Sequence, residues 1–280
     1  MSQMPSVHIS DGHAAVGDRP GAEAQPLGER CLTPPALAVT SILAGLLVWE
    51  LVARAFFQPF TLPAPSAVAA KAFELLRTGN LLGHIAASYT RIFTGFVIGS
   101  AVGGLLGIAM GTVSHIRRLL EPLVNFFRFI PPIAWIGPVL IWFGIGEASK
   151  VLLIVYTTSF MVLLNALAGI SSIPRNQLRA AECFGASTFQ VFCLIMLPAA
   201  VRYLLTGMRI GLMNSFATII TAEMIAAQSG LGYLILVSFN YSAVDTIFVS
   251  IATLGVLGLV TSQLFDKISR LIAWRYYLDA

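Results

Sequence analysis

The chain has 280 residues, of which 57% are hydrophobic and 11% are charged, and its formal net charge is +4. Soluble domains carry about 25% charged residues because their surface faces water, so this composition excludes an ordinary soluble protein. In a membrane protein the positive charge is explained by basic cytoplasmic loops, and we expect no nucleic-acid binding. The three cysteines lack a C-x-x-C spacing, so neither a disulfide framework nor a metal site is expected.

Residues 1–34 are polar and rich in Gly, Pro and Ala, without the apolar core of a signal peptide. We expect a disordered cytoplasmic tail there. Six later stretches are apolar and long enough to cross a bilayer, which takes about 20 residues each. The predicted spans are 35–57, 89–113, 119–143, 151–170, 194–227 and 246–265. The sequence therefore predicts an all-α polytopic membrane protein of about six transmembrane helices, and the long fifth span can also be two shorter helices.

Residues 58–88 separate the first two spans and contain a short helix signal. Ser66 is a suitable N-cap for a helix over 67–77, and Gly79 can end that helix in the left-handed conformation. We predict an amphipathic helix that lies on the outer membrane interface. The alternative is an ordinary connecting helix.

The second span carries five glycines at a spacing of four residues: Gly95, Gly99, Gly103, Gly107 and Gly111. This spacing places them in one stripe along a helix. Because lipid tails give helices no hydrophobic reason to associate, close backbone approach through small residues has to hold them together. The stripe predicts tight packing against another helix, either within the chain or across a dimer.

Polar and proline residues within the third and fifth spans mark a candidate translocation path. Prolines in the third span must distort it and free backbone carbonyls, while ionisable groups inside spans usually face protein or water. We expect these two spans to bring two guanidiniums and an amide to a shared cavity, where Arg suits a planar oxyanion. The alternative is that both arginines anchor their helices at the inner leaflet. The candidate path residues are Arg128, Pro131, Pro132, Trp135, Arg209, Asn214 and Glu223.

Lys and Arg concentrate in cytoplasmic loops, so their distribution predicts the topology. Six spans that start from an inside N-terminus place these cations in cytoplasmic stretches: Arg19, Arg30, Arg117, Arg118, Arg175, Arg179, Arg202, Lys267, Arg270 and Arg275. They place fewer in outer stretches: Arg54, Lys71, Arg77, Arg91 and Lys150. The bias favours both termini in the cytoplasm, with a C-terminal tail at 271–280.

Residues 173–198, between the fourth and fifth spans, form a predicted cytoplasmic helix–turn–helix. Pro174 suits the first turn of a helix, and Gly185 can end it. Ser187 and Gln190 have the spacing of a capping box for a second helix. Phe184 lies beside the turn, where an exposed aromatic suits docking into a partner's groove. The alternative is a plain interfacial loop.

This segment resembles the EAA loop of ABC importer permeases. The family pattern is Glu-Ala-Ala, three residues, Gly, nine residues and Ile-x-Leu-Pro, and the chain matches every landmark except the first, where Arg179 replaces Glu. The resemblance implies that the loop is a coupling helix that seats on a cytoplasmic ATPase subunit. The coupling residues that it implies are Arg179, Ala180, Ala181, Phe184, Gly185, Ala186, Ser187, Ile195, Leu197 and Pro198.

Further stretches at 62–65, 129–135, 141–146, 222–224 and 230–232 resemble the nitrate, sulfonate, taurine and bicarbonate branch of these permeases. The resemblance implies a type I ABC importer permease fold with a core at 89–270, in the cell inner membrane. It also implies a second permease chain, in a homodimer, a dimer of ATP-binding subunits and an extracytoplasmic binding protein. The implied solute is small and anionic.

The chain lacks a G-x-x-x-x-G-K-[ST] phosphate loop, so we expect no ATPase site of its own, no catalytic residue and no cofactor. ATP would be bound by the partner subunit. One alternative is an ion-coupled secondary transporter, for which Glu223 is the candidate carboxylate. A membrane-embedded enzyme is the other, but the four histidines are scattered and form no catalytic motif.

Overall fold

The computed structural model describes residues 34–272, so the two predicted tails fall almost entirely outside the described residues. Internal contacts divide the chain into two units, Met1–Gly45 and Leu46–Ala280, and the features below belong to the second. Every regular element between residues 34 and 272 is a helix. In chain order the helices are α1 (Pro34–Phe56), α2 (Pro65–Arg77), α3 (Asn80–Thr112), α4 (Ser114–Phe127), η1 (Pro132–Trp135), α5 (Ile136–Phe143), α6 (Glu147–Ser171), α7 (Arg175–Cys183), α8 (Thr188–Val191), the π-helical η2 (Phe192–Met196), α9 (Leu197–Ala226), α10 (Leu231–Asn240) and α11 (Val244–Ile272).

Within the described residues, five helices are long and apolar enough to cross a membrane, and a bent pair makes a sixth span if counted as one. The bent pair is α4 with η1 and α5, whose axes turn by 91°. Pro131 and Pro132 stand at the break, because neither can donate the backbone hydrogen bond that would continue a helix. The prediction of an all-α membrane protein with about six spans is confirmed.

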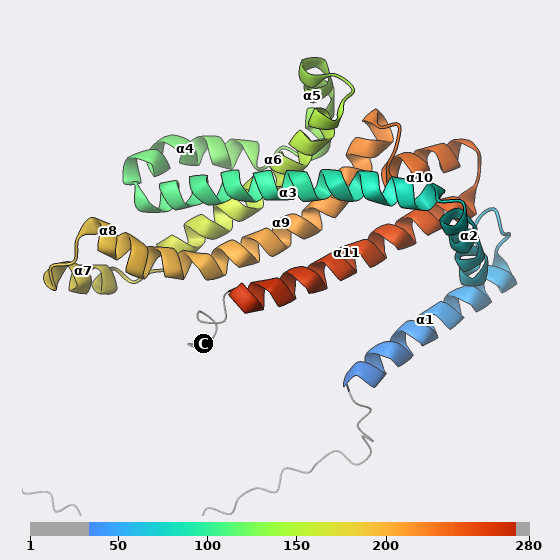
Figure 1. The fold of residues 1–280 in the computed structure, drawn as a ribbon, viewed down its shortest axis with the longest axis horizontal. Coiled ribbons are helices and arrows are strands. Elements are labelled where there is room, and N and C mark those ends of the chain that lie inside the picture. The colour runs from blue at the N-terminus through green and yellow to red at the C-terminus, as the bar shows by residue number, and fades with distance from the viewer. Residues whose placement is uncertain (1–33, 273–280) are drawn as a thin grey trace, which may run out of the picture. The chain divides into compact units, whose positions relative to one another are not determined.

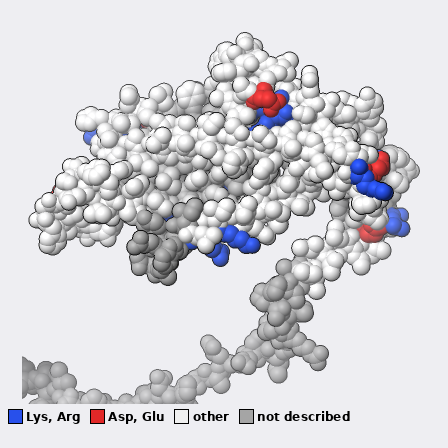
Figure 2. Space-filling model, in the orientation of Figure 1, with Lys and Arg blue, Asp and Glu red and all other residues white. Residues whose placement is uncertain are grey.

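The long helices α3, α6, α9 and α11 run side by side, and α6 packs along both α3 and α9 (Figure 1). The short helices α7 and α8 lie at one end of this group, and α2 and α10 lie at the other (Figure 1). Charged side chains on the face drawn in Figure 2 form a few small groups that are separated by broad uncharged areas. Such a surface suits lipid, which cannot solvate isolated charges.

The glycine stripe of α3 faces α6 along its whole length. A Cβ added at Gly95 would lie 2.6 Å from Ile154 Cβ, and one at Gly107 would lie 2.6 Å from the carbonyl oxygen of Leu163. At Gly103 the nearest atoms include the Cα of Ser159, at 2.9 Å. Gly99 and Gly111 meet Thr158 and Ile170 of α6 in the same way. The stripe therefore brings two helices of one chain into backbone contact.

Several helix boundaries differ from those expected from the sequence. Helix α2 begins at Pro65 with Ala64 as its N-cap, so the expected N-cap Ser66 lies inside the helix. Helix α3 begins at Asn80, directly after Gly79 with its φ of +74°, so nine residues assigned to the outer segment are helical. The fifth predicted span continues without a break through α8, η2 and α9. Residues 231–240, taken as loop, form α10, a ten-residue helix that is too short to span. It is held by tertiary packing, with Leu231 and Leu234 buried beside Val249 of α11.

Candidate functional site

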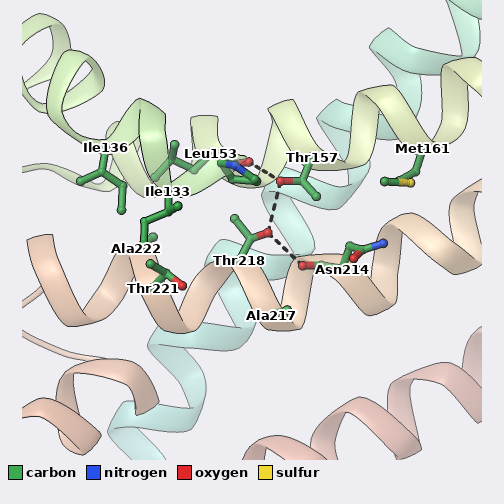
Figure 3. A pocket seen from close by; sticks show the side chains of 11 residues that line it. Ile133, Ile136, Leu153, Thr157, Met161, Asn214, Ala217, Thr218, Thr221 and Ala222 are labelled. Carbon is green, nitrogen blue, oxygen red and sulfur yellow. Dashed lines mark hydrogen bonds between the residues drawn. The ribbon is translucent and has the colours of Figure 1, made fainter. Parts of the chain in front are cut away.

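A cavity of about 360 Å³ lies between η1, the start of α5, α6 and α9 (Figure 3). Its wall is apolar at one end, where Ile133 and Ile136 approach Ala222, and polar in the middle, where Thr157 of α6 faces Thr218 of α9 (Figure 3). None of the eleven lining residues is charged. The cavity can therefore contact a solute through oxygen atoms and apolar surface, but it offers no ion pair.

The hydroxyl groups of the cavity are tied to the helices that carry them. Thr157 Oγ1 lies 3.0 Å from the carbonyl of Leu153 and 3.2 Å from Thr218 Oγ1, and Thr218 Oγ1 donates to the carbonyl of Asn214 at 2.9 Å. The Asn214 amide donates to the carbonyl of Ile210 at 3.1 Å. Because a hydroxyl has only one proton, both threonines already use their donors. The cavity thus offers few free donors, the hydroxyl of Thr221 and the second N–H of the Asn214 amide, and suits weak contact with a solute.

The apolar end of the cavity is closed by side chains from three helices. Ile136 and Val139 of α5 pack against Leu153 of α6 and Ala222 of α9 in one buried cluster. Beyond this cluster, the gap that Lys150 helps to line is too small to hold a water molecule. We call the four apolar residues the plug. The cavity is therefore sealed in this structure on the side that leads toward Lys150.

The two arginines expected in the cavity do not reach it, so the expectation of converging guanidiniums is wrong. Arg209 points to α11 and forms an ion pair with Asp266 at 3.1 Å. Arg209 and Asn214 are five positions apart, which corresponds to about 140° around a helix, so the two face different sides. Arg128 is exposed, and its guanidinium lies 4.8 Å from the ring centroid of Phe129. Of the predicted path residues, Pro132 and Asn214 line the cavity.

Trp135 and Pro131 lie near the cavity but not in its wall. Trp135 lines a neighbouring apolar pocket with Trp142 and Tyr156, and Pro131 precedes η1 in an extended conformation. The hydroxyl of Tyr156 lies 2.5 Å from the carbonyl of Phe127, which also accepts the backbone N–H of Ile130, and 3.1 Å from the carbonyl of Ile130, just before the proline break. Sequence reasoning missed Tyr156, because nothing local to it points to a break 26 residues away.

Glu223 also lies outside the cavity wall, in an ionic group that is buried except for Glu147 and that we call the Arg91 cluster: Ser88, Arg91, Glu147, Lys150 and Glu223. Arg91 Nη1 donates to Glu223 at 2.7 Å, and Arg91 Nη2 donates to Glu147 at 2.8 Å, with a further bond from Nε to Glu147. Lys150 Nζ donates to Glu147 at 3.0 Å. The cluster joins the N-terminal ends of α3 and α6 to the C-terminal end of α9.

The turn between α9 and α10 is fastened to the same cluster. Arg91 Nη1 donates to the carbonyl of Ser229 at 2.6 Å, and the backbone N–H of Gly232 donates to Glu223 at 2.9 Å. The Ser88 hydroxyl lies 2.8 Å from Glu223 and accepts from the N–H of Leu231. A Cβ at Gly232 would lie 2.9 Å from that of Glu223, so glycine allows this approach. Apart from Glu223, these residues were not singled out as a site, since their sequence positions are far apart.

At the other end of the long helices, α7 and α8 form a projecting pair. Gly185, with a φ of +78°, makes the turn after α7. Ser187 caps α8: its hydroxyl accepts from the N–H of Gln190, and the Gln190 side chain accepts from the N–H of Ser187. The side chains of Phe184 and Phe189 are 92% and 74% exposed. Large apolar groups this exposed beside polar helices mark an interaction surface.

The remaining coupling residues lie on both sides of that turn. Arg179 and Ala180 are exposed on α7, and Ala181 and Ala186 are half-buried next to the turn. Within residues 34–272, Arg179 has no hydrogen bond or ion pair. Ile195 lies in η2, and Leu197 and Pro198 begin α9. The loop landmarks thus lie in one continuous segment that runs from α7 through the turn into the start of α9.

Comparison with known proteins gives a consistent result. A family model described as the binding-protein-dependent transport system inner membrane component matches residues 99–275. A probable ABC transporter permease protein of Brucella abortus (strain 2308) is 38% identical, over 87% of this chain and 97% of the relative. The taurine transport system permease protein TauC of Escherichia coli (strain K12) is 36% identical, over 79% of this chain and 83% of the relative.

The fold matches solved structures as well. The crystal structure of a bacterial ABC transporter involved in the import of the acidic polysaccharide alginate matches with a TM-score of 0.61 at 15% identity, over 85% of this chain and 95% of the other.

Proposed function

We propose that this chain passes a small anionic solute through the cavity between η1, α6 and α9. The chain belongs to the binding-protein-dependent transport system inner membrane component family and is a permease subunit of an ABC importer. A second copy of the chain completes the path, two ATP-binding subunits supply the energy, and an extracytoplasmic binding protein delivers the solute. The chain itself carries no ATPase site and needs no cofactor.

The observation that carries the proposal is the α7–α8 projection with Phe184 at its tip. A phenyl ring that is 92% exposed on a polar, two-helix knob has no function within the chain. Pressed into an apolar groove, it would bury most of its surface and transmit movement to α9, because η2 and α9 continue directly from α8. This suits a lever that an ATP-binding subunit pushes.

The polar but uncharged cavity supports a role as a transient route. A transport path must bind its solute weakly enough to release it, and here the threonine donors are already used within the chain. The taurine permease among the relatives supports a sulfonate or a similar small anion as the solute.

The distribution of charge supports a cytoplasmic position for the α7–α8 projection and for both termini. Two of the five cations assigned to outer stretches, Arg91 and Lys150, are buried in ion pairs inside helices. They therefore do not count as loop charges under the positive-inside rule, and the bias toward the α7–α8 side becomes stronger. Glu223, on which an ion-coupled transporter would depend, is buried in the Arg91 cluster, so no observation favours that alternative.

The coupling surface can be tested with its own cysteine. Cys183 is exposed and directly precedes Phe184, so a photoactivatable cross-linker on its thiol will label whatever seats on the projection. With Cys31 and Cys193 replaced by Ser, we expect capture of the ATP-binding subunit from the assembled complex. Phe184→Ala should reduce capture and solute-stimulated ATP hydrolysis about tenfold or more, because it removes most of the buried area at the tip.

Phe57→Ala is the matched control for this experiment, because Phe57 is exposed but lies between α1 and α2, far from the projection in the sequence. It should leave capture unchanged. If the cross-linker captures no ATP-binding subunit from a complex that hydrolyses ATP, the proposed coupling surface is wrong.

The path can be tested by changing one cavity hydroxyl. Thr218→Val keeps the shape of the side chain and removes its hydroxyl, which can turn from the carbonyl of Asn214 to donate to a passing anion. We therefore expect ATP-driven uptake of taurine into proteoliposomes to slow about fivefold, the value of one hydrogen bond. Thr253→Val in α11 removes a hydroxyl with the same i−4 backbone bond outside the cavity and should not slow uptake. Equal rates for the two variants would remove Thr218 from the path.

A further inference from the structure

The Arg91 cluster contains two cations and two carboxylates, but the carboxylates differ in kind. Glu223 is fully buried and accepts hydrogen bonds from Ser88, Arg91 and the backbone of Gly232. Glu147 is the first residue of α6, and its side chain is 63% exposed. One carboxylate is therefore a fixed internal group, and the other reaches the cluster from the surface.

Both cations depend on that exposed carboxylate. The side chains of Arg91 and Lys150 are each only 5% exposed. Within the described residues, Glu147 is the only hydrogen-bonding partner of the Lys150 ammonium group. Arg91 turns its Nε and Nη2 to the same carboxylate, so three nitrogen donors from two buried cations converge on one surface group.

We propose that Arg91 and Lys150 form a binding site for a small oxyanion, such as a sulfonate, nitrate or carboxylate, and that Glu147 occupies this site until the solute displaces it. The proposal rests on the proposed function and adds to it the place where the solute is first held. A guanidinium fork with an ammonium beside it matches two or three oxygens on one centre.

The charge balance of the cluster couples the departure of the Glu147 carboxylate to the arrival of the solute anion. If Glu147 left alone, two buried cations would face only Glu223, and an unpaired buried charge is costly. An incoming anion restores neutrality, so departure of the carboxylate and arrival of the solute favour each other. Glu147 can leave by side-chain rotation, since it stands at the start of its helix with an exposed side chain.

The position of Lys150 relates this site to the cavity. Lys150 lines the closed gap together with Ile136, Val139, Leu153 and Ala222, which form the plug. Three of these residues, Ile136, Leu153 and Ala222, also line the cavity on its other side. The plug therefore lies between Lys150 and the cavity, and movement of α5, which supplies two of its four residues, would open a route between the two.

The test uses the purified full chain in nanodiscs and its thermal unfolding midpoint, in sodium chloride and in sodium methanesulfonate or sodium nitrate of equal ionic strength. Glu147→Gln neutralises the carboxylate that occupies the proposed site. We expect its midpoint in chloride to fall below that of the unchanged chain and to recover by several degrees in methanesulfonate or nitrate, because a ligand that binds only the folded state raises stability.

Two controls make the result specific. Glu147→Gln combined with Lys150→Gln removes a cation as well and should lose most of the recovery. Glu74→Gln breaks a Lys–Glu pair of the same i,i+3 spacing at Lys71, which is 28% exposed, and should show no recovery. Recovery of equal size in all three variants, or in none, overturns the proposal.

A second measurement covers the case in which Glu147→Gln cannot be purified in chloride. Recovery of folded protein only when methanesulfonate is present supports the site. If neither salt recovers folded protein, the test is the KM of taurine uptake by the complete transporter. Lys150→Gln should raise this KM about tenfold, which is the effect of losing a charged hydrogen bond. Lys150→Arg should raise it less. An unchanged KM in Lys150→Gln overturns the proposal, whereas absent ATP-driven uptake by the unchanged chain would count against the proposed function instead.

Discussion

Helix α3 is held in two different ways along its length. From Gly95 to Gly111 it lies against α6 with backbone touching backbone and no charged group between them. Around Ser88 and Arg91, one helical turn and more away, it is joined to α6, α9 and α10 by ion pairs and hydrogen bonds. The first interface depends on the absence of side chains, and the second depends on a few particular ones.

The difference follows from what each region must do in a membrane. Close glycine packing gains dispersion energy over many atoms and leaves no polar group to satisfy, so it suits a permanent contact among lipid tails. An ionic cluster is costly to bury and stays favourable only while every charge is paired. It can therefore be rearranged by exchanging one partner, as the exposed position of Glu147 allows. We infer that α3 and α6 move as one body and that change occurs at the Arg91 end.

The largest expected effect comes from breaking the glycine interface. Gly103→Leu places four side-chain atoms where even a Cβ meets the backbone of Ser159. The cost should exceed the about 1–3 kcal/mol of ordinary overpacking, and we expect loss of the monodisperse peak in size-exclusion chromatography. Gly83→Ala lies in the same helix with open space around it and should be neutral or slightly stabilising. A well-behaved Gly103→Leu protein would show that the two helices are not locked together.

A smaller loss of stability is expected when Glu223, the fixed carboxylate of the Arg91 cluster, is neutralised. Glu223→Gln keeps the shape but leaves the buried Arg91 with half its charge balance, and we expect about 3 kcal/mol of destabilisation. The same change at Glu147 should cost less, because the Glu147 side chain is 63% exposed and water screens its ion pairs. Thermal unfolding of both variants in the same lipid measures the difference. Equal losses would mean that the two carboxylates have the same role.

The smallest effect on stability is expected at the α7–α8 turn, which is held neither by close glycine packing nor by buried ion pairs. Gly185→Ala places a Cβ at a φ of +78° and should cost about 1 kcal/mol locally, without change in folded yield. Solute-stimulated ATP hydrolysis should fall, because the strain alters how Phe184 is presented. Gly185→Asn should retain more activity, since Asn tolerates the left-handed conformation better. Activity in the order Asn below Ala would contradict this explanation.

Much of the fold could be predicted from the sequence, since its strongest signals are local. Apolar runs predicted the spans, and the spacing of Ser187 and Gln190 predicted the cap of α8, which the structure has. The cavity could be predicted only in part: Pro132 and Asn214 line it, whereas Arg128 and Arg209 do not. The direction in which a side chain points around a span depends on which helix packs on which face, and a single span does not carry that information.

Patterns in the sequence were enough to predict a membrane protein, a close helical neighbour for α3 and a helix–turn–helix over residues 173–198. These properties depend on hydrophobicity, on helical period and on residues within a few positions of one another. Helix packing in three dimensions makes α6 that neighbour, bends the third span by 91° and brings Arg91 to Glu147 and Glu223. Those contacts join residues 56 and 132 positions apart, and only the packing of α3, α6 and α9 brings them within hydrogen-bonding distance.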